Sequence, residues 1–327
     1  MAGGIVSSAH GFGQYLHMHD VLLLGPQFRA PNLRDALAHA GLQGPVVTIT
    51  AGWQEREGEL GALEEHLGLH ARDLRLYERA EAVFDAAPAL HDAYRARQNE
   101  LRHLQDLYRL RLGHAKAAAQ ALMRSDDDSP LMRKARRSAI GGLRRLDAEH
   151  LRDVRVVHAR FEAQLAASKR PILATQQSEV ASLVASAALV CIAGGHVAVL
   201  VNRLRLFGLD HALRGKPVAA WSAGAMAVSD RVVLFHDHPS QGAGNAELFE
   251  AGLGLVSAAV FLPHAATRLA TEDPQRIALL ARRFAPAACY TLDDGNYLLW
   301  RRGRLAAAAG SRRLSRSGRL APAGGDS

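Results

Sequence analysis

Short apolar runs that end in glycine, alternating with helical segments, constrain the fold of this chain most. Val21–Leu24 leads into Gly25-Pro26, and Val46–Thr50 leads into Ala51-Gly52. The uninterrupted apolar run Val21–Leu24 is typical of a strand buried on both faces of a parallel sheet, and Val46–Thr50 is predicted to be a second strand. The sequence between and after them predicts a helix over 32–41 closed by Gly41, a helix near 58–67 ended by Gly68, and a third strand over Leu74–Tyr77.

The same alternation returns later in the chain. We expect a helix over 176–187, a strand over 188–193 that ends in Gly194-Gly195, a helix over 197–207 and a strand over 218–221. Further strands are expected at 258–262, 288–292, 296–300 and 304–309, and the tail from 311 is compatible with a last hairpin. The predicted fold class is therefore α/β, with a doubly wound, mostly parallel sheet.

Residues 86–169 interrupt this alternation and carry no strand signal. Apolar residues recur every three or four positions from Leu101 to Leu122, and again from Leu143 to Leu165. Such stripes predict two long helices, each about 50 Å long at about 1.5 Å per residue. The turn at 125–130 would make them an antiparallel hairpin inserted into one α/β domain of 20–85 and 170–327, after a flexible segment 1–19. The hairpin could be a packing or dimerisation arm, which makes a homo-oligomer the expected state, or a lid.

The net charge of +8 and the pI near 10.0 raise the question of a nucleic-acid partner. Arginines crowd into 95–160 and 301–319, but in the first stretch they alternate with Asp and Glu, which favours a solvated helix face. No nucleic-acid partner is therefore expected. We also expect no membrane partner, because no apolar run approaches about 20 residues.

The two cysteines, Cys191 and Cys289, both fall in apolar runs. This predicts buried free thiols in a reducing compartment. Since the N-terminus lacks a basic start followed by an apolar stretch, the expected location is cytoplasmic.

Ala220-Trp221-Ser222-Ala223-Gly224-Ala225 is the strongest local signal for chemistry. An apolar strand runs into a serine with small neighbours, and a small-residue helix follows, as on a strained nucleophile elbow. The Ala223 amide and the helix N-terminus would then be free to stabilise an oxyanion. The alternative is an ordinary helix start.

Gly194-Gly195 follows the preceding predicted strand. Ligands of open parallel sheets bind beyond the carboxyl ends of the strands, where a glycine pair can bring a second amide next to the nucleophile. The alternative is a tight turn without a catalytic role.

These segments together resemble the dipeptidase E and cyanophycinase family of serine peptidases, which has the class I glutamine amidotransferase-like fold. The resemblance rests on Ala193–His196, Leu200, Leu204, Gly208–Asp210 and Val218–Ala225, and it covers 20–80 loosely and 175–310 more closely. It leaves the helical insertion out. Ala220 stands where the family usually has glycine, and His196, the expected substrate contact, where asparagine is usual.

The resemblance also implies a base and an acid. His264, at the end of the apolar run Phe261–Pro263, resembles the family's strand-end histidine, and Arg268 lies where a helix start with an arginine is expected. Asp237 occupies the region in which dipeptidase E has its acid, with Asp230 and Glu247 as rivals. The turn Asp293–Asn296 resembles the family's acidic turn and is expected to be structural or a pocket edge.

The function expected from these residues is hydrolysis of an amide in a small peptide through an acyl-enzyme. The resemblance implies aspartyl peptides or cyanophycin as substrates, and no cofactor. A serine in place of cysteine disfavours glutamine amidotransfer. His196, His236, His238 and His264 lack a metal-ligand spacing, so no metal is expected. The alternatives are a catalytically degenerate scaffold that binds through its helical arm, an Arg-rich nucleic-acid binder and, ranked lower, an α/β-hydrolase.

Overall fold

The computed structural model describes residues 20–167, 170–235 and 246–324. The predicted flexible segment 1–19 lies outside them. The described central sheet has the strand order β11-β10-β1-β5-β4-β2-β3. Its strands are β1 (Val21–Leu24), β2 (Val46–Ile49), β3 (Arg72–Asp73), β4 (Leu189–Ile192), β5 (Val218–Trp221), β10 (Tyr297–Arg301) and β11 (Arg304–Ala309). Strands β1 to β5 run parallel, whereas β10 and β11 are antiparallel additions at one edge.

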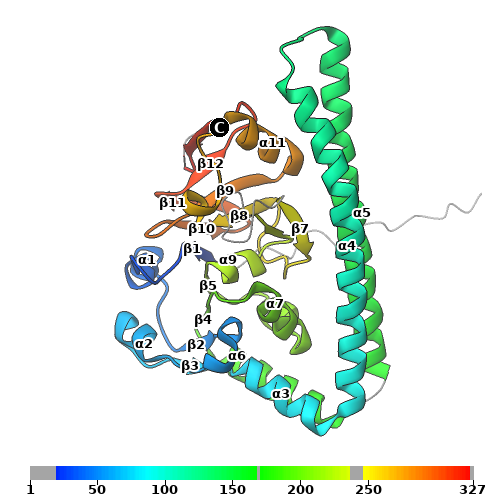
Figure 1. The fold of residues 1–327 in the computed structure, drawn as a ribbon. Helices are drawn as coiled ribbons and strands as arrows, with labels where there is room; N and C mark the ends of the chain where they lie inside the picture. The colour runs from blue at the N-terminus through cyan, green and yellow to red at the C-terminus, as the bar shows by residue number, and fades with distance from the viewer. Residues whose placement is uncertain (1–19, 168–169, 236–245, 325–327) are drawn as a thin grey trace, which may run out of the picture.

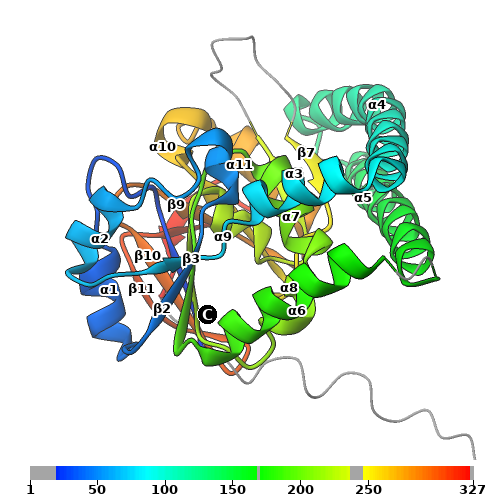
Figure 2. The ribbon, with the colours of Figure 1, turned by 90° about the horizontal axis from the view of Figure 1, so that it is seen from below.

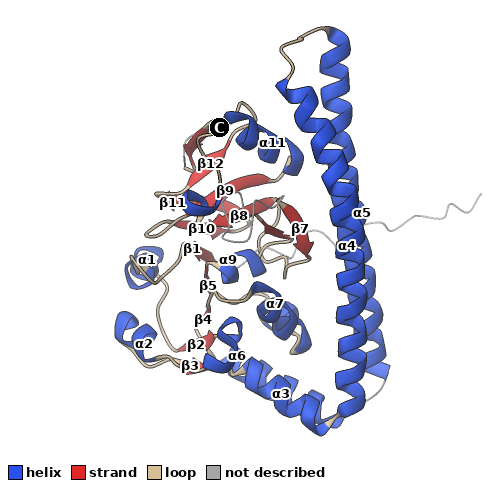
Figure 3. Ribbon diagram, viewed as in Figure 1, coloured by secondary structure: helices blue, strands red, loops and turns tan. Residues whose placement is uncertain are grey.

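Helices cover both faces of this sheet, which explains why its parallel strands β1, β4 and β5 are apolar at every position (Figures 1 and 3). Leu22 and Leu24 of β1 pack on the face of α1 (Leu33–Ala40) and α2 (Gly61–Leu67). Val21 and Leu23 belong to the opposite core. That core is formed with α3 (Leu76–Ala86), α6 (Pro171–Ser186), α7 (Val197–Leu206), α8 (Leu209–Ala212) and α9 (Ala223–Ala227). The predicted doubly wound α/β fold is confirmed.

A second, four-stranded sheet and a two-stranded hairpin adjoin the central sheet. The second sheet has the order β13-β12-β9-β8, with β8 parallel to β9. Its elements are β8 (Ala259–Pro263), α10 (Ala265–Arg268), α11 (Pro274–Phe284), β9 (Ala288–Leu292), β12 (Arg312–Leu314) and β13 (Leu320–Pro322). The hairpin pairs β6 (Val232–Leu234) with β7 (Glu247–Glu250). The strands at 258–262 and 288–292 were predicted from the sequence, but their membership of a separate sheet was not.

The helical insertion consists of α4 (Pro88–Arg124) and α5 (Pro130–Ala167), which run side by side along one flank of the α/β body (Figures 1 and 2). Pro130 begins α5, as the turn signal predicts. The apolar stripes of both helices pack against each other and against the second sheet and α11; the buried members include Tyr108, Leu112, Leu143, Leu146 and Val154. In Figure 1 the turn between the helices lies beyond α11.

Buried polar groups fasten this arm to the body. Arg283 of α11 donates to both carboxylate oxygens of Asp147 on α5, at 2.7 Å each, and to the Tyr108 hydroxyl on α4 at 2.6 Å. His158 of α5 lies 2.8 Å from Glu250 of β7. Since breaking a buried, hydrogen-bonded ion pair costs several kcal/mol, the arm is an integral part of the fold.

The predicted strand over 74–77 is wrong. Arg75 has φ +51°, and α3 begins at Leu76. The Asp73 side chain accepts a hydrogen bond from the Arg75 amide at 2.6 Å, which favours a turn there. Leu76, Ala80, Val83 and Phe84 are buried at helical spacing, and this pattern outweighs the short alternation of Leu74 and Leu76.

Candidate active site

Ser222 lies on a strained turn between β5 and α9. Its backbone has φ +52° and ψ −119°, outside the regions that side-chain-bearing residues favour. The amide of Ser222 donates to the Leu24 carbonyl of β1 at 3.1 Å, which fixes the turn at the carboxyl edge of the sheet. A Cβ on Gly224 would lie 2.3 Å from the Ile192 carbonyl oxygen, so a glycine is required at this position by space.

Gly194 packs directly beside Ser222, and Gly195 packs against Gly52. A Cβ on Gly194 would lie 2.9 Å from Cβ and 3.2 Å from Oγ of Ser222. Gly195 has φ +106°, and a Cβ there would lie 2.3 Å from the carbonyl oxygen of Gly52. Both glycines are therefore needed for close approach.

Gly52 belongs to the 3-10 turn η1 (Ala51–Arg56) that follows β2, and its carbonyl accepts from the His196 amide at 2.7 Å. Three loops thus meet at the sheet edge. Gly52 was not among the predicted site residues, although its place directly after an apolar strand was a signal.

Two backbone amides remain available beside the serine. In the described part of the chain, the amides of Gly195 and Ala223 donate to no hydrogen-bond acceptor. Ala223 is the first residue of α9, where amides have no partner within the helix. Such unpaired amides are the usual donors to a developing oxyanion.

His264 is brought to Ser222 by β8. Its amide donates to the Leu292 carbonyl of β9 at 3.1 Å, and its backbone adopts a left-handed conformation with φ +59°. The ring Nε2 lies 3.4 Å from Ser222 Oγ. This separation is slightly longer than a formed catalytic hydrogen bond, as is common before a substrate binds.

The environment of His264 favours the neutral imidazole. Burial lowers the pKa of this histidine, and the positive charges of Arg268 and Arg29 lower it further, while Asp294 and Asp293 act in the opposite direction. A neutral ring is the form that can accept a proton from the serine.

Asp293 holds the segment that follows His264. Its Oδ1 accepts from the Ala266 amide at 2.8 Å, and burial raises the pKa of its carboxyl group. Gly25, after β1, approaches so closely that a Cβ would lie 1.8 Å from the Asp293 carbonyl oxygen. These contacts fit a structural role for the 293–296 turn, which is one of the two roles expected for it.

The candidate acids fall into two groups. Asp237, with its neighbours His236 and His238, lies outside the described residues. Asp230 pairs with Arg231 at 2.8 Å, and Glu247 is held by both Nε and Nη2 of Arg109 on the arm, at 2.6 and 2.8 Å. Within the described residues, no carboxylate oxygen lies within hydrogen-bond distance of the His264 ring.

The two expected substrate contacts, His196 and Arg268, are both exposed. His196 caps α7, with its Nδ1 accepting from the Val199 amide at 3.3 Å, so that only Nε2 is left for a ligand. Arg268 ends the short helix α10 and acts on His264 through its charge.

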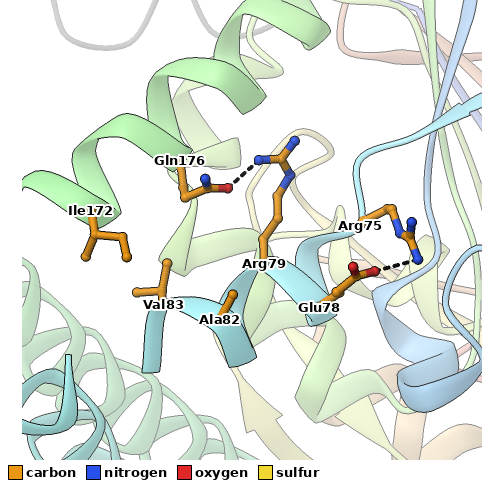
Figure 4. Close-up of a pocket in the computed structure, with 7 residues that line it drawn as sticks. All are labelled: Arg75, Glu78, Arg79, Ala82, Val83, Ile172 and Gln176. Atoms are coloured by element: carbon orange, nitrogen blue, oxygen red, sulfur yellow. Dashed lines mark hydrogen bonds and ion pairs between the residues drawn. The ribbon is translucent and has the colours of Figure 1, made fainter. Parts of the chain in front are cut away.

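Other clusters and cavities are separate from this site. Among the described residues, no group of three or more His, Cys, Asp and Glu side chains is arranged to hold a metal ion. In a cavity of about 280 Å³ between α3 and α6, Arg75 pairs with Glu78 and Arg79 donates to Gln176 (Figure 4). Arg79 also pairs with Glu179. None of the residues that line this cavity belongs to the serine site.

A comparison of the sequence with family models finds a match. The model of peptidase family S51 matches residues 147–307, a range that includes Gly194-Gly195, Ser222 and His264. Over this part of its length the chain is similar to peptidase family S51. Since S51 is a family of serine-type peptidases, we assign the chain as a serine-type peptidase, and so as a hydrolase. The S51 match begins inside α5, whereas the resemblance seen in the sequence left the whole helical insertion out.

Two solved structures are similar to this serine-type peptidase. One, a peptidase from an acI-B1 Actinobacterium, has 15% identity and a TM-score of 0.44, with 96% of this chain and 98% of that chain covered. The other, a putative peptidase E protein from Listeria monocytogenes EGD-e, has 14% identity and a TM-score of 0.43, with 91% and 100% covered. A search of curated proteins finds no match.

Two further properties bear on the chain as a whole. Both cysteines are buried and free, as predicted. None of the described helices combines the length and the apolar character that crossing a bilayer requires.

Proposed function

We propose that this serine-type peptidase cleaves small aspartyl-type peptides, or the related linkages of a cyanophycin-like polymer, through an acyl-enzyme. The observation that carries the proposal is the pairing of a strained serine with a histidine. Ser222 Oγ lies 3.4 Å from His264 Nε2, and Gly194 packs closely against the serine.

In the first step, Ser222 Oγ forms a bond to the scissile carbonyl carbon while His264 Nε2 takes the hydroxyl proton. The carbonyl oxygen becomes negative and receives hydrogen bonds from the amides of Gly195 and Ala223. His264 then passes its proton to the departing amine, and the C–N bond breaks to leave an ester on Ser222. Water, deprotonated by the same imidazole, hydrolyses this ester and returns the proton to the serine.

An acid has to orient His264 and stabilise its protonated form. Asp237 remains our proposal for this role. Its two rivals are each engaged by an arginine, Asp230 by Arg231 and Glu247 by Arg109. A carboxylate already held in two hydrogen bonds by one guanidinium is poorly placed to serve a ring elsewhere.

The charges next to His264 support an acidic substrate side chain. Arg268, at the end of α10, and Arg29, on the loop after β1, are both exposed, and both act on the pKa of His264 through their charge. Gln27 stabilises the loop that carries Arg29, because its Oε1 accepts from the amides of Asn32 and Leu33 at 2.9 Å. Two cations beside the base would attract a substrate carboxylate.

The test of substrate class is kcat/KM on dipeptides that differ only in the first residue: Asp-Leu, Asn-Leu and Ala-Leu. We expect Asp-Leu to be preferred by about ten-fold or more, since a charge-assisted hydrogen bond contributes roughly 1.5–3 kcal/mol. Arg268→Gln should remove most of this preference, whereas Arg152→Gln, on the arm, should keep it. Equal rates on Asp-Leu and Ala-Leu would refute the acidic specificity, and no hydrolysis of any peptide would favour a degenerate scaffold.

A further inference from the structure

A second charged region lies at the junction of α5, α11 and the turn between β12 and β13, and it shares no residue with the serine site. It is a cavity of about 630 Å³. Its lining includes one carboxylate, Asp128, and the apolar or small residues Ile140 and Gly141. The other lining residues are all arginines: Arg133, Arg136, Arg137, Arg144, Arg282 and Arg316.

Backbone carbonyls hold four of these guanidinium groups in fixed directions. Arg133 and Arg136 donate to carbonyls of the turn that precedes α5. Nε and Nη2 of Arg144 donate to the Arg282 carbonyl at 2.9 and 2.5 Å. Nε of Arg282 donates in turn to the Arg316 carbonyl at 2.9 Å. A guanidinium has five N–H donors, so Arg144 and Arg282 keep donors for another partner.

The positive charge of this cavity is largely uncompensated. Asp128 contacts Arg133 and Arg136, at 3.1 and 3.5 Å, and one carboxylate therefore serves two guanidinium groups. Arg137 and Arg316 make no ion pair with any described residue. The segment 129–146 contains six Lys and Arg residues and no Asp or Glu. Repulsion among crowded like charges raises the free energy of the folded protein, and a bound anion would lower it.

The arginines of the middle of the arm behave differently. Arg111 pairs with Glu149 at 2.8 Å, and Arg160 pairs with Glu100. A solvated helix face with alternating charges explains those residues, as the sequence suggested. It does not explain a concave site in which six arginines from three separate elements surround one acid.

We propose that this cavity binds a short polyphosphate group. Several fixed guanidinium forks match the multiple oxygens of adjacent phosphates, and arginine binds phosphate in two parallel hydrogen bonds. A volume of about 630 Å³ suits a small ligand rather than a polymer. The group can be inorganic polyphosphate or the phosphates of a nucleotide; because α5 and α11 both line the cavity, either would bridge the arm and the body.

The direct test is calorimetric titration of the full chain with inorganic triphosphate at low and at moderate salt. Arg137→Gln removes a cavity charge, and Arg152→Gln removes one charge from the same helix outside the cavity. We expect triphosphate to bind, Arg137→Gln to weaken binding about ten-fold, and Arg152→Gln to change it less than two-fold. Both variants should keep the thermal stability of the ligand-free protein, because both side chains are exposed.

Parallel titrations with ATP, adenosine and RNA distinguish free polyphosphate from a nucleotide, and both from an extended nucleic-acid surface. ATP binding equally to triphosphate indicates free polyphosphate, and tighter ATP binding with no binding of adenosine indicates a nucleotide; both support the site. Equal weakening by the two variants, or no triphosphate binding at low salt, overturns it. Binding of a 20-mer RNA without binding of triphosphate also overturns it, in favour of an extended nucleic-acid surface.

Discussion

Ser222 Oγ and His264 Nε2 lie 3.4 Å apart although the strands that carry them belong to different sheets. Ser222 follows β5 of the central sheet, whereas His264 follows β8 of the second. The two sheets are joined at this edge, because β9 pairs with β8 and continues through the 293–296 turn into β10, which pairs with β1. The geometry of the pair therefore depends on how the two sheets meet.

The pH dependence of kcat/KM should report on His264. The base works as the neutral imidazole, and its pKa lies below the ordinary value of 6.5, so activity should persist into mildly acidic buffer and fall only below that pKa. Arg268→Gln removes a charge that lowers the pKa and should move the acid limb to higher pH. Asp294→Asn removes a charge that raises it and should move the limb to lower pH. Shifts in the same direction would contradict the assignment of the limb to His264.

Gly194→Ala should damage catalysis through Ser222. The new Cβ would lie 2.9 Å from the serine Cβ, so the serine has to move. We expect a fall in kcat of about 100-fold with the fold retained, because a displacement of about 1 Å is worth roughly that factor. The matched control is Gly113→Ala in α4, where no atom lies within 4 Å of the new Cβ. It should stabilise the helix by about 0.5–1 kcal/mol and leave kcat unchanged.

Asp147→Asn should destabilise the whole chain. This substitution leaves the Arg283 guanidinium, with a side chain 3% exposed, without its counter-charge. Breaking a buried pair of this kind costs about 3–5 kcal/mol, measurable by urea unfolding. Glu149→Gln removes an exposed pair with Arg111 on the same helix and should change stability little. If both variants unfold at the same urea concentration, the arm is not fastened through Asp147.

Glu57 should make stability depend on pH near neutrality. Burial raises its pKa from 4.5 to about 7, so the folded state binds a proton that the unfolded state releases. The folded state is thus progressively disfavoured from pH 4.5 upwards, and the loss is complete above pH 7. Glu57→Gln should therefore match the parent protein at pH 4.5 and exceed it at pH 8 by about 1–2 kcal/mol, a figure reduced for partial exposure. A gain of the same size at both pH values would point to another cause.

Sequence patterns predicted the local elements of the sheet well. The run Val21–Leu24 is a strand with the predicted bounds, and Gly41 and Gly68 end α1 and α2 in left-handed conformations. These features depend on neighbouring residues only. Residues 74–77 were mispredicted because a two-residue alternation is too short to distinguish a strand from a helix start.

The parts of the site that come from distant segments were harder to anticipate. The elbow glycines could be found because close approach of backbones admits no side chain. Gly52 marks a close approach of the same kind, since a Cβ there would lie 2.4 Å from the Gly194 carbonyl oxygen, but its place after a strand did not say which loop it would meet. The separate sheet of β8 and β9 was likewise missed, since an apolar run does not say which strands pair with it.

The arm was predicted as two helices, but not the way in which it is held. Its apolar stripes pack on the body, and Tyr108, Asp147 and Arg283 lie far apart in the sequence. From the sequence alone, these side chains look like ordinary polar residues of an exposed helix face, and only the fold shows that they contact one another. Homo-oligomerisation through the arm stays a prediction; the outward residues Leu107 and Leu110, 48% and 63% exposed, are the positions at which polar substitutions would test it by light scattering.

Reaction with a fluorophosphonate probe tests the central claim most directly, namely that His264 activates Ser222. Mass spectrometry of the labelled protein should find the probe on Ser222, and labelling should be abolished by Ser222→Ala. His264→Ala should slow the labelling by about 1,000-fold or more, because the serine loses its base. Labelling of Ser222 at an unchanged rate in His264→Ala, or labelling at another residue, would contradict the account.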